Sequence, residues 1–373
     1  MEAPPSKRNP VASFTDEILA EILRRLPIRS VCQFKCVSRS WRDLISYSVH
    51  REKLPQTLVG VFYHSFNSDR CPMTAHHFTN VSGIGLPWID PSFSFLGVPN
   101  NRVSLLDSCN GLLLCYWHVY HKGHEGDIIS SSLQYAVCNP ATHKWVMLPD
   151  LHHGWEGEVR LGFDPIVSSH FHVISYVLDE GGYVTGVEIY SSKTAAWTFK
   201  ESEWGDDVML HDRTRSVFLH GFIHMLTFDD GIVAVDMDGE TWKTIPIPSG
   251  GGSGCIHQSQ GRLYLLNTDS ENAFKLSIWI LEDYDTHKWT LKHTVCTAKL
   301  FRKNNLRFDR HYKVIAVHPE CNLIFFVFGS DNTLMAYEMD RKEVRVIRKL
   351  GHDCSGPYLP CVPMWSALAD EQI

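Results

Sequence analysis

The chain has 373 residues, with 35 Lys and Arg against 42 Asp and Glu, and its net charge of −7 at pH 7 excludes a protein that binds nucleic acid through overall basic charge. Hydrophobic residues make up 44% of the chain and charged residues 21%, which excludes a disordered protein and leaves enough apolar surface for a large domain and a small one. The longest apolar runs, such as 324–328, are about five residues, against the roughly 20 that cross a bilayer, so no membrane partner is expected.

The N-terminal residues 1–10 are polar and are not followed by the apolar segment of a secretory signal. The 11 cysteines are scattered without a regular framework, which favours reduced thiols over disulfides. We therefore expect a cytoplasmic or nuclear protein, or one that occupies both compartments.

Charge divides the chain into two modules. Residues 1–55 hold ten Lys and Arg against six Asp and Glu, a balance of +4, which leaves −11 for the remainder. This asymmetry predicts a small basic module at the N-terminus and a large acidic module behind it, with a boundary near residue 50.

The small module has the pattern of three short helices. In 16–26, apolar residues recur at helical spacing, at Ile18, Leu19, Ile22, Leu23 and Leu26, and Pro27 ends the helix. Ser30 can cap a second helix through Val31, Phe34 and Val37, and Ser38 or Ser40 a third through Trp41, Leu44 and Ile45. Three helices of this size cannot cover each other's apolar faces, so they pack either on the following domain or on another protein.

These residues favour the second alternative. The segments 14–19 (FTDEIL), Leu26-Pro27, 34–41 (FKCVSRSW) and Leu44-Ile45 resemble the plant version of the F-box motif, which implies docking to a Skp-family adaptor. The family usually opens with Leu-Pro where this chain has Phe14-Thr15, and this departure bears on affinity for the adaptor. The adaptor-binding residues that the resemblance implies are Phe14, Ile18, Ile22, Leu26, Pro27, Val31, Phe34, Val37 and Trp41.

The large module repeats loosely. A short strand that starts near Gly or Asn recurs at 110–114, 171–174, 220–224, 260–264 and 321–325. A second strand, a polar turn and a Trp follow it, with the Trp at positions 145, 197, 242 and 289 and Val344 in the fifth unit. Repeats of about 40 to 50 residues with four strands each predict a mainly β protein, a β-propeller whose Trp residues fill the space between blades.

Five repeats are visible, and strands outside them supply a sixth. Strand-like stretches occur at 57–64, 93–98 and 102–106, and one more apolar segment, 358–365, lies near the C-terminus. Pairing the early strands with the segment 361–365 would close the ring without an open edge, so we predict about six blades. Pro360 and Pro363 predict a short strand or an edge strand there.

A second resemblance covers this module. The segments 108–113 (SCNGLL), 139–149 (NPATHKWVMLP), 161–165 (LGFDP), 187–192 (VEIYSS) and 245–248 (IPIP) are similar to the plant F-box-associated domain, and Gly181-Gly182 with Tyr190 and Trp197 is close to a kelch repeat. The two resemblances imply a non-catalytic substrate receptor of an SCF-type ubiquitin ligase, in which the adaptor bridges to a cullin and its RING partner. The expected organisation is a disordered segment 1–12, an F-box 13–50, a linker 51–56, a propeller 57–367 and a tail 368–373.

The sequence also bears on other classes of function. The common motifs of hydrolases, phosphate-binding loops and zinc proteases do not occur, so no catalytic residue, cofactor or metal is predicted. The Gly-rich segment 249–254 is expected to be a flexible connection, Cys32 and Cys36 small buried side chains, and His118, His121, His124, His152 and His153 surface loop residues. The alternative function is a propeller enzyme or a carbohydrate-binding module in which Trp117 or Trp155 stacks on a sugar ring.

Overall fold

The computed structural model describes residues 15–24, 34, 37–38, 41, 58–87, 89–99, 102–122, 128–152, 159–205, 207–211, 214–229, 231–248, 251–269, 274–303 and 306–364. The chain divides into two compact units, Met1–Thr57 and Leu58–Ile373. No helix among the described residues is long and apolar enough to span a membrane.

In the first unit the described helix is α1 (Asp16–Arg24). Its ladder starts with the N–H of Leu19, which donates to the carbonyl of Thr15 (3.1 Å). Phe34 and Trp41 are also helical, and the N–H of Trp41 donates to Oγ of Ser38 (3.2 Å), the capping bond expected of a Ser at a helix start. The rest of the second and third predicted helices lies outside the described residues.

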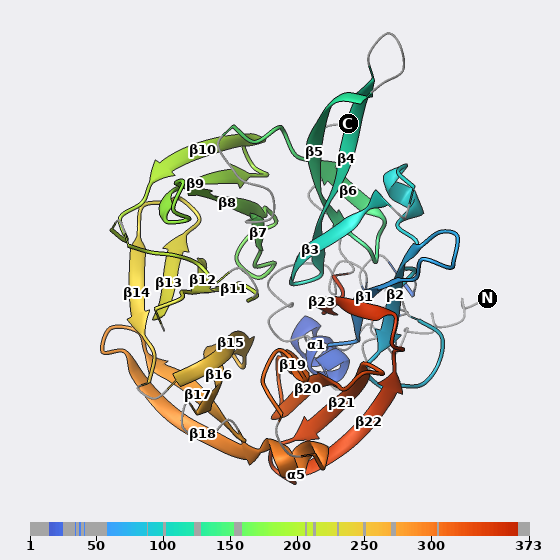
Figure 1. The fold of residues 1–373 in the computed structure, drawn as a ribbon, viewed down its shortest axis with the longest axis vertical. Helices are drawn as coiled ribbons and strands as arrows, with labels where there is room; N and C mark the ends of the chain where they lie inside the picture. Colours follow the sequence, from blue (N-terminus) through green and yellow to red (C-terminus); the bar gives the residue numbers. More distant parts are fainter. Residues whose placement is uncertain are drawn as a thin grey trace, which may run out of the picture. The chain divides into compact units, whose positions relative to one another are not determined.

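The described part of the second unit forms six antiparallel sheets arranged as a ring, which confirms the predicted six-bladed propeller (Figure 1). The first four-stranded sheet contains β3 (Ser104–Cys109), β4 (Leu112–Lys122), β5 (Ile128–Asn139) and β6 (Lys144–Met147). The second contains β7 (Val159–Gly162), β8 (His172–Leu178), β9 (Val184–Ser191) and β10 (Ala196–Glu201). The third contains β11 (Val217–Leu219), β12 (Phe222–Leu226), β13 (Gly231–Asp236) and β14 (Trp242–Pro246).

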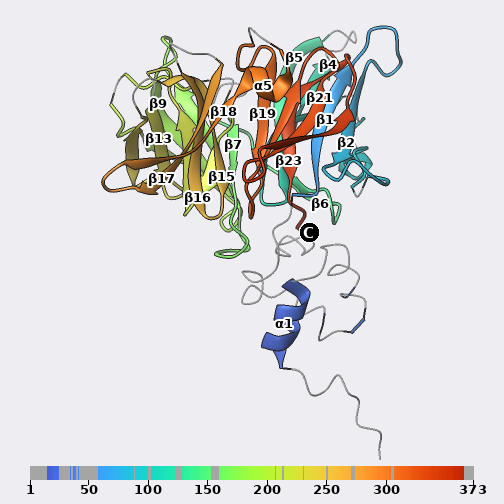
Figure 2. The same cartoon turned by 90° about the horizontal axis from the view of Figure 1, so that it is seen from below.

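The fourth sheet contains β15 (Gly251–Ser259), β16 (Arg262–Asp269), β17 (Lys275–Asp283) and β18 (Lys288–Cys296). After a short helix α5 (Thr297–Phe301), the fifth contains β19 (Tyr312–Val317), β20 (Leu323–Phe328), β21 (Thr333–Glu338) and β22 (Glu343–Lys349). In each of these five sheets the first strand lies toward the centre of the ring and the last at its rim (Figure 1). Seen edge-on, the inner strands β7, β15 and β19 run through the thickness of the ring (Figure 2).

Turn chemistry explains the repeat in the sequence. In three of the sheets, the innermost strand joins the next strand through two residues that both have positive φ: Asn110-Gly111, His220-Gly221 and Gln260-Gly261. Two-residue hairpins need this left-handed backbone at both positions, which Gly adopts without strain. The recurring Gly before an apolar run therefore marks the turn between the first and second strands of a blade.

The recurring Trp marks the start of each outer strand. Trp145, Trp197, Trp242 and Trp289 pair with Cys138, Tyr190, Val235 and Leu281 on the neighbouring strand, and Val344 pairs with Tyr337 in the fifth sheet. The indole N–H groups of Trp197 and Trp289 donate to the carbonyls of Pro149 and Pro246 in the preceding blade, both at 2.9 Å. These two side chains thus connect adjacent blades, as the sequence predicts.

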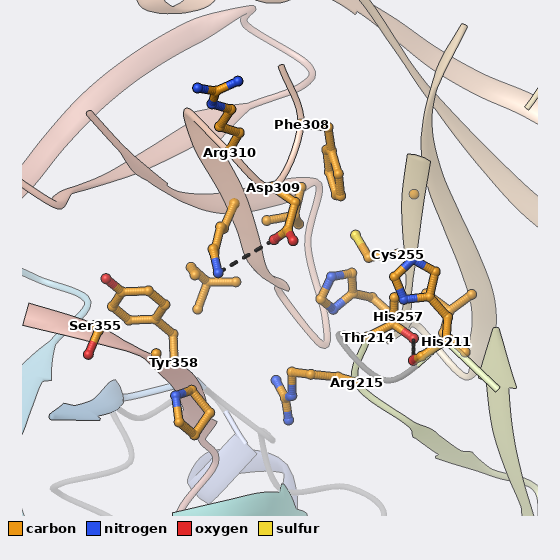
Figure 3. Close-up of a pocket in the computed structure, with 17 residues that line it drawn as sticks. His211, Thr214, Arg215, Cys255, His257, Phe308, Asp309, Arg310, Ser355 and Tyr358 are labelled. Carbon is orange, nitrogen blue, oxygen red and sulfur yellow. Dashed lines mark hydrogen bonds and ion pairs between the residues drawn. The ribbon is translucent and has the colours of Figure 1, made fainter. Parts of the chain in front are cut away.

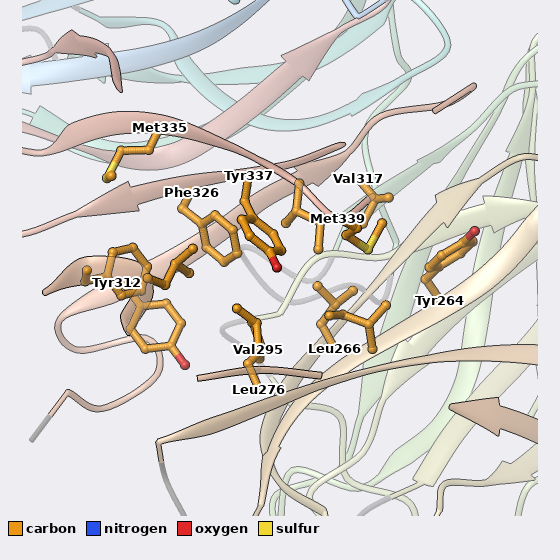
Figure 4. Close-up of a cluster of buried hydrophobic side chains, with 14 of the residues drawn as sticks. Tyr264, Leu266, Leu276, Val295, Tyr312, Val317, Phe326, Met335, Tyr337 and Met339 are labelled. Atoms are coloured by element: carbon orange, nitrogen blue, oxygen red, sulfur yellow. The ribbon is translucent and has the colours of Figure 1, made fainter. Parts of the chain in front are cut away.

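The core lies between blades. The cluster in Figure 4 joins the fourth and fifth sheets, with Leu266 and Leu276 on one side and Tyr312, Phe326 and Tyr337 on the other. Similar clusters occupy the junctions of the first and second, second and third, and third and fourth sheets. Each blade therefore buries its apolar faces against its neighbours, and none is a separate core.

The sixth sheet closes the ring with strands from both ends of the unit. It has the order β2-β1-β23, with β1 (Gly60–Phe66), β2 (Thr74–Asn80) and β23 (Cys354–Cys361). Gly60 pairs with Cys361 and Ser65 with Cys354. The predicted closure by early and C-terminal strands is confirmed, but the closing strand is Cys354–Cys361, and of the predicted segment 361–365 only Cys361 lies on it among the described residues. Pro360 lies on this innermost strand, which pairs with β1 alone among the described strands, and Trp365 lies outside the described residues.

Near this sheet, one predicted strand is absent, and another, at 102–106, forms as part of β3 but belongs to a different blade. The stretch 93–98 contains a short 3-10 helix, η2 (Ser94–Leu96), because Phe93 and Gly97 both have left-handed backbone (φ 49° and 69°), which ends an extended strand. The stretch 102–106 does not belong to the closing blade either, since β3 is the inner strand of the first four-stranded sheet.

Candidate functional site

The apolar face of α1 is divided into a buried half and an exposed half. Leu19 and Leu23 are buried, whereas the side chains of Ile18 and Ile22 are 47% and 43% exposed. Residues four apart lie one above the other on a helix, so Ile18 and Ile22 form one continuous apolar stripe. This stripe (Ile18 and Ile22) is surface that the described residues leave uncovered.

A second apolar feature of this unit surrounds Ser38. The rings of Phe34 and Trp41 pack with centroids 5.0 Å apart, and Val37 between them in sequence is 61% exposed. Phe34 and Trp41 are half-buried, so they support each other while keeping part of their surface accessible. The remaining predicted adaptor-binding residues, Phe14, Leu26, Pro27 and Val31, lie outside the described residues.

The propeller contains a cavity of about 930 Å³ at one end of its central axis. Its lining comes from the segments before β11 and before β19, from the middle of β15, and from the first halves of β19 and β23. Leu58, where the described propeller begins, lies at the other end of the ring, because Gly60 pairs with the last residue of β23. We call this space the axial cavity; Figure 3 shows its lining.

A buried carboxylate holds one wall of the axial cavity. Oδ2 of Asp107, on β3, accepts the N–H of Leu161 on β7 and the hydroxyl of Ser216 before β11, both at 3.1 Å. The guanidinium of Arg215 lies 3.6 Å from Oδ1 of the same carboxylate and donates to Oγ of Ser108 (3.0 Å). Asp107 thus connects three inner strands and orients Arg215 at the cavity.

Further polar groups of the axial cavity come from β15, from β19 and from the segment just before β19. Lys313 lies 3.5 Å from Oδ1 of Asp309, with both side chains partly exposed. His257 is buried, and burial together with the nearby charge of Arg215 lowers its pKa to about 3, so the imidazole is neutral at pH 7. Burial and the charge of Asp309 raise the pKa of the Cys255 thiol, which therefore stays protonated and is a poor nucleophile.

The wall of the cavity at position 254 is packed so closely against β16 that it requires a Gly. A Cβ at this position would lie 2.8 Å from the carbonyl oxygen of Leu266 and 2.9 Å from Cβ of Asn267 on β16. The pairing of β15 with β16 shifts register between Gly251 and Gly254. The prediction that 249–254 is a flexible connection is therefore wrong for 251–254, which begins an inner strand, and at position 254 of that strand only Gly fits.

The family profile described as "F-box associated beta propeller domain" matches residues 96–355, well over half of the chain. The chain belongs to the F-box-associated β-propeller family. The profile described as "F-box domain" matches residues 12–52 of this family member, which includes α1, Phe34 and Trp41. The recognition of a plant F-box protein from its sequence is thus confirmed.

Curated relatives of this F-box-associated propeller protein come from Arabidopsis thaliana. F-box protein At5g07610 is 24% identical over 311 residues, which is 75% of this chain and 70% of the relative. F-box protein At5g49610 is 25% identical over 315 residues (76% and 79%), and the F-box/kelch-repeat protein At1g15680 is 24% identical over 369 residues (87% and 81%). A solved nidogen/laminin complex aligns with a TM-score of 0.41 and 8% identity over 77% of this chain and 91% of its own.

Several side chains of the F-box-associated propeller lie elsewhere than predicted. Trp117 is 4% exposed on β4 and cannot stack on a sugar, and Trp155 lies outside the described residues. His118 and His121 are on β4 and not in a loop, whereas His152 is an exposed loop residue as predicted, with Nδ1 3.5 Å from Oε1 of the buried Glu188. His124, His153, Cys32 and Cys36 lie outside the described residues, within which no group of three His, Cys, Asp or Glu residues is placed to hold a metal ion.

Asp107 and Arg215 were missed by the sequence interpretation. Their partners lie 54 and 109 residues from Asp107 along the chain, and no local motif joins them. A signal was nevertheless present, since Asp107 is a carboxylate inside a strand otherwise composed of Leu, Ser and Cys. A charged residue within an apolar inner strand must be paired, because an unpaired buried charge costs several kcal/mol.

Proposed function

We propose that the protein is the substrate receptor of an SCF-type ubiquitin ligase. The F-box would dock a Skp-family adaptor, the adaptor would join a cullin and its RING partner, and the propeller would hold a protein target. Such a receptor acts without chemistry of its own, in the cytoplasm or the nucleus. The F-box and F-box-associated domain in one chain support this role, as do relatives that carry the F-box name.

The observation that carries the proposal is the exposed stripe of α1. Two adjacent Ile side chains that stay about half exposed on a small helical module are typical of a surface that a partner covers. Val37 and the paired rings of Phe34 and Trp41 add further accessible apolar surface in the same unit. An adaptor that covers the stripe removes this surface from water and gains affinity from its burial.

The test is a double variant, Ile18→Ala with Ile22→Ala, in a quantitative pull-down with a recombinant Skp-family adaptor. Loss of two interface anchors costs about 2 to 3 kcal/mol, so we expect affinity to fall roughly thirty- to a hundredfold. Because both side chains are exposed in the described structure, the melting temperature of the propeller should not change.

The matched control is Ile84→Ala with Leu86→Ala, a pair of apolar side chains on the propeller that are 80% and 86% exposed. This control removes as much exposed aliphatic surface, and we expect it to bind the adaptor like the unaltered chain. Undiminished capture by the α1 variant, or equal loss in both variants, contradicts the proposed docking surface.

A further inference from the structure

Cationic side chains outnumber carboxylates in the lining of the axial cavity, although the module as a whole is acidic. Residues 56–373 have a net charge of −11, yet the lining contains Arg215, Arg310 and Lys313 against one carboxylate, Asp309, which pairs with Lys313. The carboxylate that pairs with Arg215, Asp107, is not part of the lining. Such a separation of charge attracts anions to one place on a molecule that elsewhere repels them.

Two of these cations are available to a ligand. The guanidinium of Arg215 extends between Tyr358 and His257, whereas that of Arg310 turns away from the other lining groups (Figure 3). The side chain of Lys313 is 49% exposed despite its ion pair with Asp309. Arg215 and Lys313 reach the cavity from different blades, so an anion between them could contact both.

An unpartnered polar group marks the same place. His257 lines the cavity, is only 7% exposed, and its Nε2 has no hydrogen-bond partner among the described residues. A buried nitrogen without a hydrogen-bond partner costs about 1 to 3 kcal/mol. A ligand oxygen that accepts a hydrogen bond from this nitrogen would recover the cost. Arg215 also keeps a buried Nε without a partner among the described residues, and a guanidinium can only donate.

Apolar side chains also line the cavity. Phe308, Ile315 and Tyr358 contribute carbon surface beside the charged groups, and the volume of about 930 Å³ is near the upper limit of the usual range for ligand pockets, ~300–1,000 Å³. A single small anion would leave most of this space empty. Several carboxylate side chains with their aliphatic stems would occupy it and meet both kinds of surface.

We infer that the axial cavity binds an acidic peptide segment of the protein target, with its carboxylates held by Arg215, Lys313 and His257. This inference rests on the proposed function, and it names the class of target that the receptor selects.

The experiment measures binding of a fluorescein-labelled hexaglutamate peptide to the full-length protein by fluorescence anisotropy. Lys313→Glu is the test variant, because this side chain is half exposed and its replacement does not leave a buried charge unpaired. We expect affinity for the peptide to fall at least tenfold. Lys349→Glu is the matched control, since Lys349 pairs with Asp331 (2.9 Å) on the outer strand of the same blade, and its affinity should stay within twofold.

Other results overturn the inference. Equal loss in both variants means that hexaglutamate binds through general surface charge, and no loss in Lys313→Glu means that it binds elsewhere. Displacement of the peptide by inorganic phosphate at similar concentration means that the cavity holds a small anion and not a peptide. Adaptor capture, measured on the same preparations, should be unchanged in Lys313→Glu, so failure here is distinguishable from failure of the receptor role.

Discussion

Asp107 is a single residue that holds neighbouring blades together at the centre of the ring. Its carboxylate receives donors from β7 and from the segment before β11 and forms an ion pair with Arg215. A buried carboxylate is unfavourable by itself, so its contribution depends on all of these partners being present.

We predict that Asp107→Ala destabilises the propeller by about 3 to 5 kcal/mol, because it leaves the N–H of Leu161, the hydroxyl of Ser216 and the charge of Arg215 without their acceptor. For a domain of this size the melting temperature should fall by roughly 6 to 10 °C in a thermal scan. Asp107→Asn keeps an acceptor oxygen and should lose less. An unchanged melting temperature in Asp107→Ala would show that the blades do not depend on this residue.

A second prediction at the residue scale concerns pH. His224 is buried, its Nδ1 lies 3.1 Å from the carbonyl oxygen of Val217 and its Nε2 3.3 Å from the hydroxyl of Tyr284, and burial lowers its pKa to about 4. The folded protein therefore keeps His224 neutral, whereas the unfolded chain protonates it below about pH 6.5. The stability that the neutral His224 contributes is fully present above about pH 6.5 and is lost as the pH falls toward 4.

At about pH 5 this single site should cost roughly 2 kcal/mol relative to pH 7.5. Burial also lowers the pKa of His257, to about 3, so this residue adds a further loss of stability as the pH falls below about 6.5. In thermal scans at the two pH values, His224→Gln, which does not titrate, should show a smaller difference than the unaltered protein. The same pH dependence in both would exclude His224 as a source.

At the scale of secondary-structure elements, the stability of the ring depends most on the closing strand β23. β23 supplies the buried Tyr358 and Leu359 and is the only described strand that pairs with the inner edge of β1. Just beyond it, the buried Asn139 of β5 donates through Nδ2 to the carbonyl of Met364 (2.8 Å). The C-terminal segment therefore contacts β1 of the sixth sheet and β5 of the first sheet, the two sheets that meet where the ring closes.

We predict that deletion of residues 357–373 lowers the melting temperature by more than 10 °C or prevents folding, because it opens the ring at this sheet. Leu359→Ala keeps the strand and should cost about 2 to 5 kcal/mol through the cavity it creates. Deletion of residues 366–373 alone is the control and should change the melting temperature little. If the longer deletion melts like the control, β23 does not close the ring.

At the scale of the whole molecule, the sequence was sufficient to predict the blades and the closure. Trp145, Trp197 and Trp289 recur because each begins an outer strand after a polar turn, and this requirement repeats with every blade. Gly111 and its equivalents recur because a two-residue hairpin needs positive φ. Such local requirements repeat with each blade, so the residues that meet them recur at regular intervals in the sequence and can be recognised there.

The candidate sites were only partly predictable. Ile18 and Ile22 were chosen with the rest of an apolar helix face, but only the folded unit distinguishes them from the buried Leu19 and Leu23. The axial cavity was not predicted, because Arg215, His257 and Lys313 come from three different blades and meet only when the ring closes. Gly254 was misinterpreted for a similar reason, since the strand that excludes a side chain there lies across the hairpin.

Closure by β23 has a consequence for the order in which the protein matures on the ribosome. The helical module through Trp41 is synthesised more than 300 residues before Cys354, the first residue of the closing strand. At about 5–20 residues per second, translation needs roughly 15 to 60 s to cover this interval. During that time the nascent chain can already present Ile18 and Ile22, while the inner edge of β1 waits for its last partner. Under the proposed function, the stripe for the adaptor would thus be available before the proposed target-binding cavity is complete.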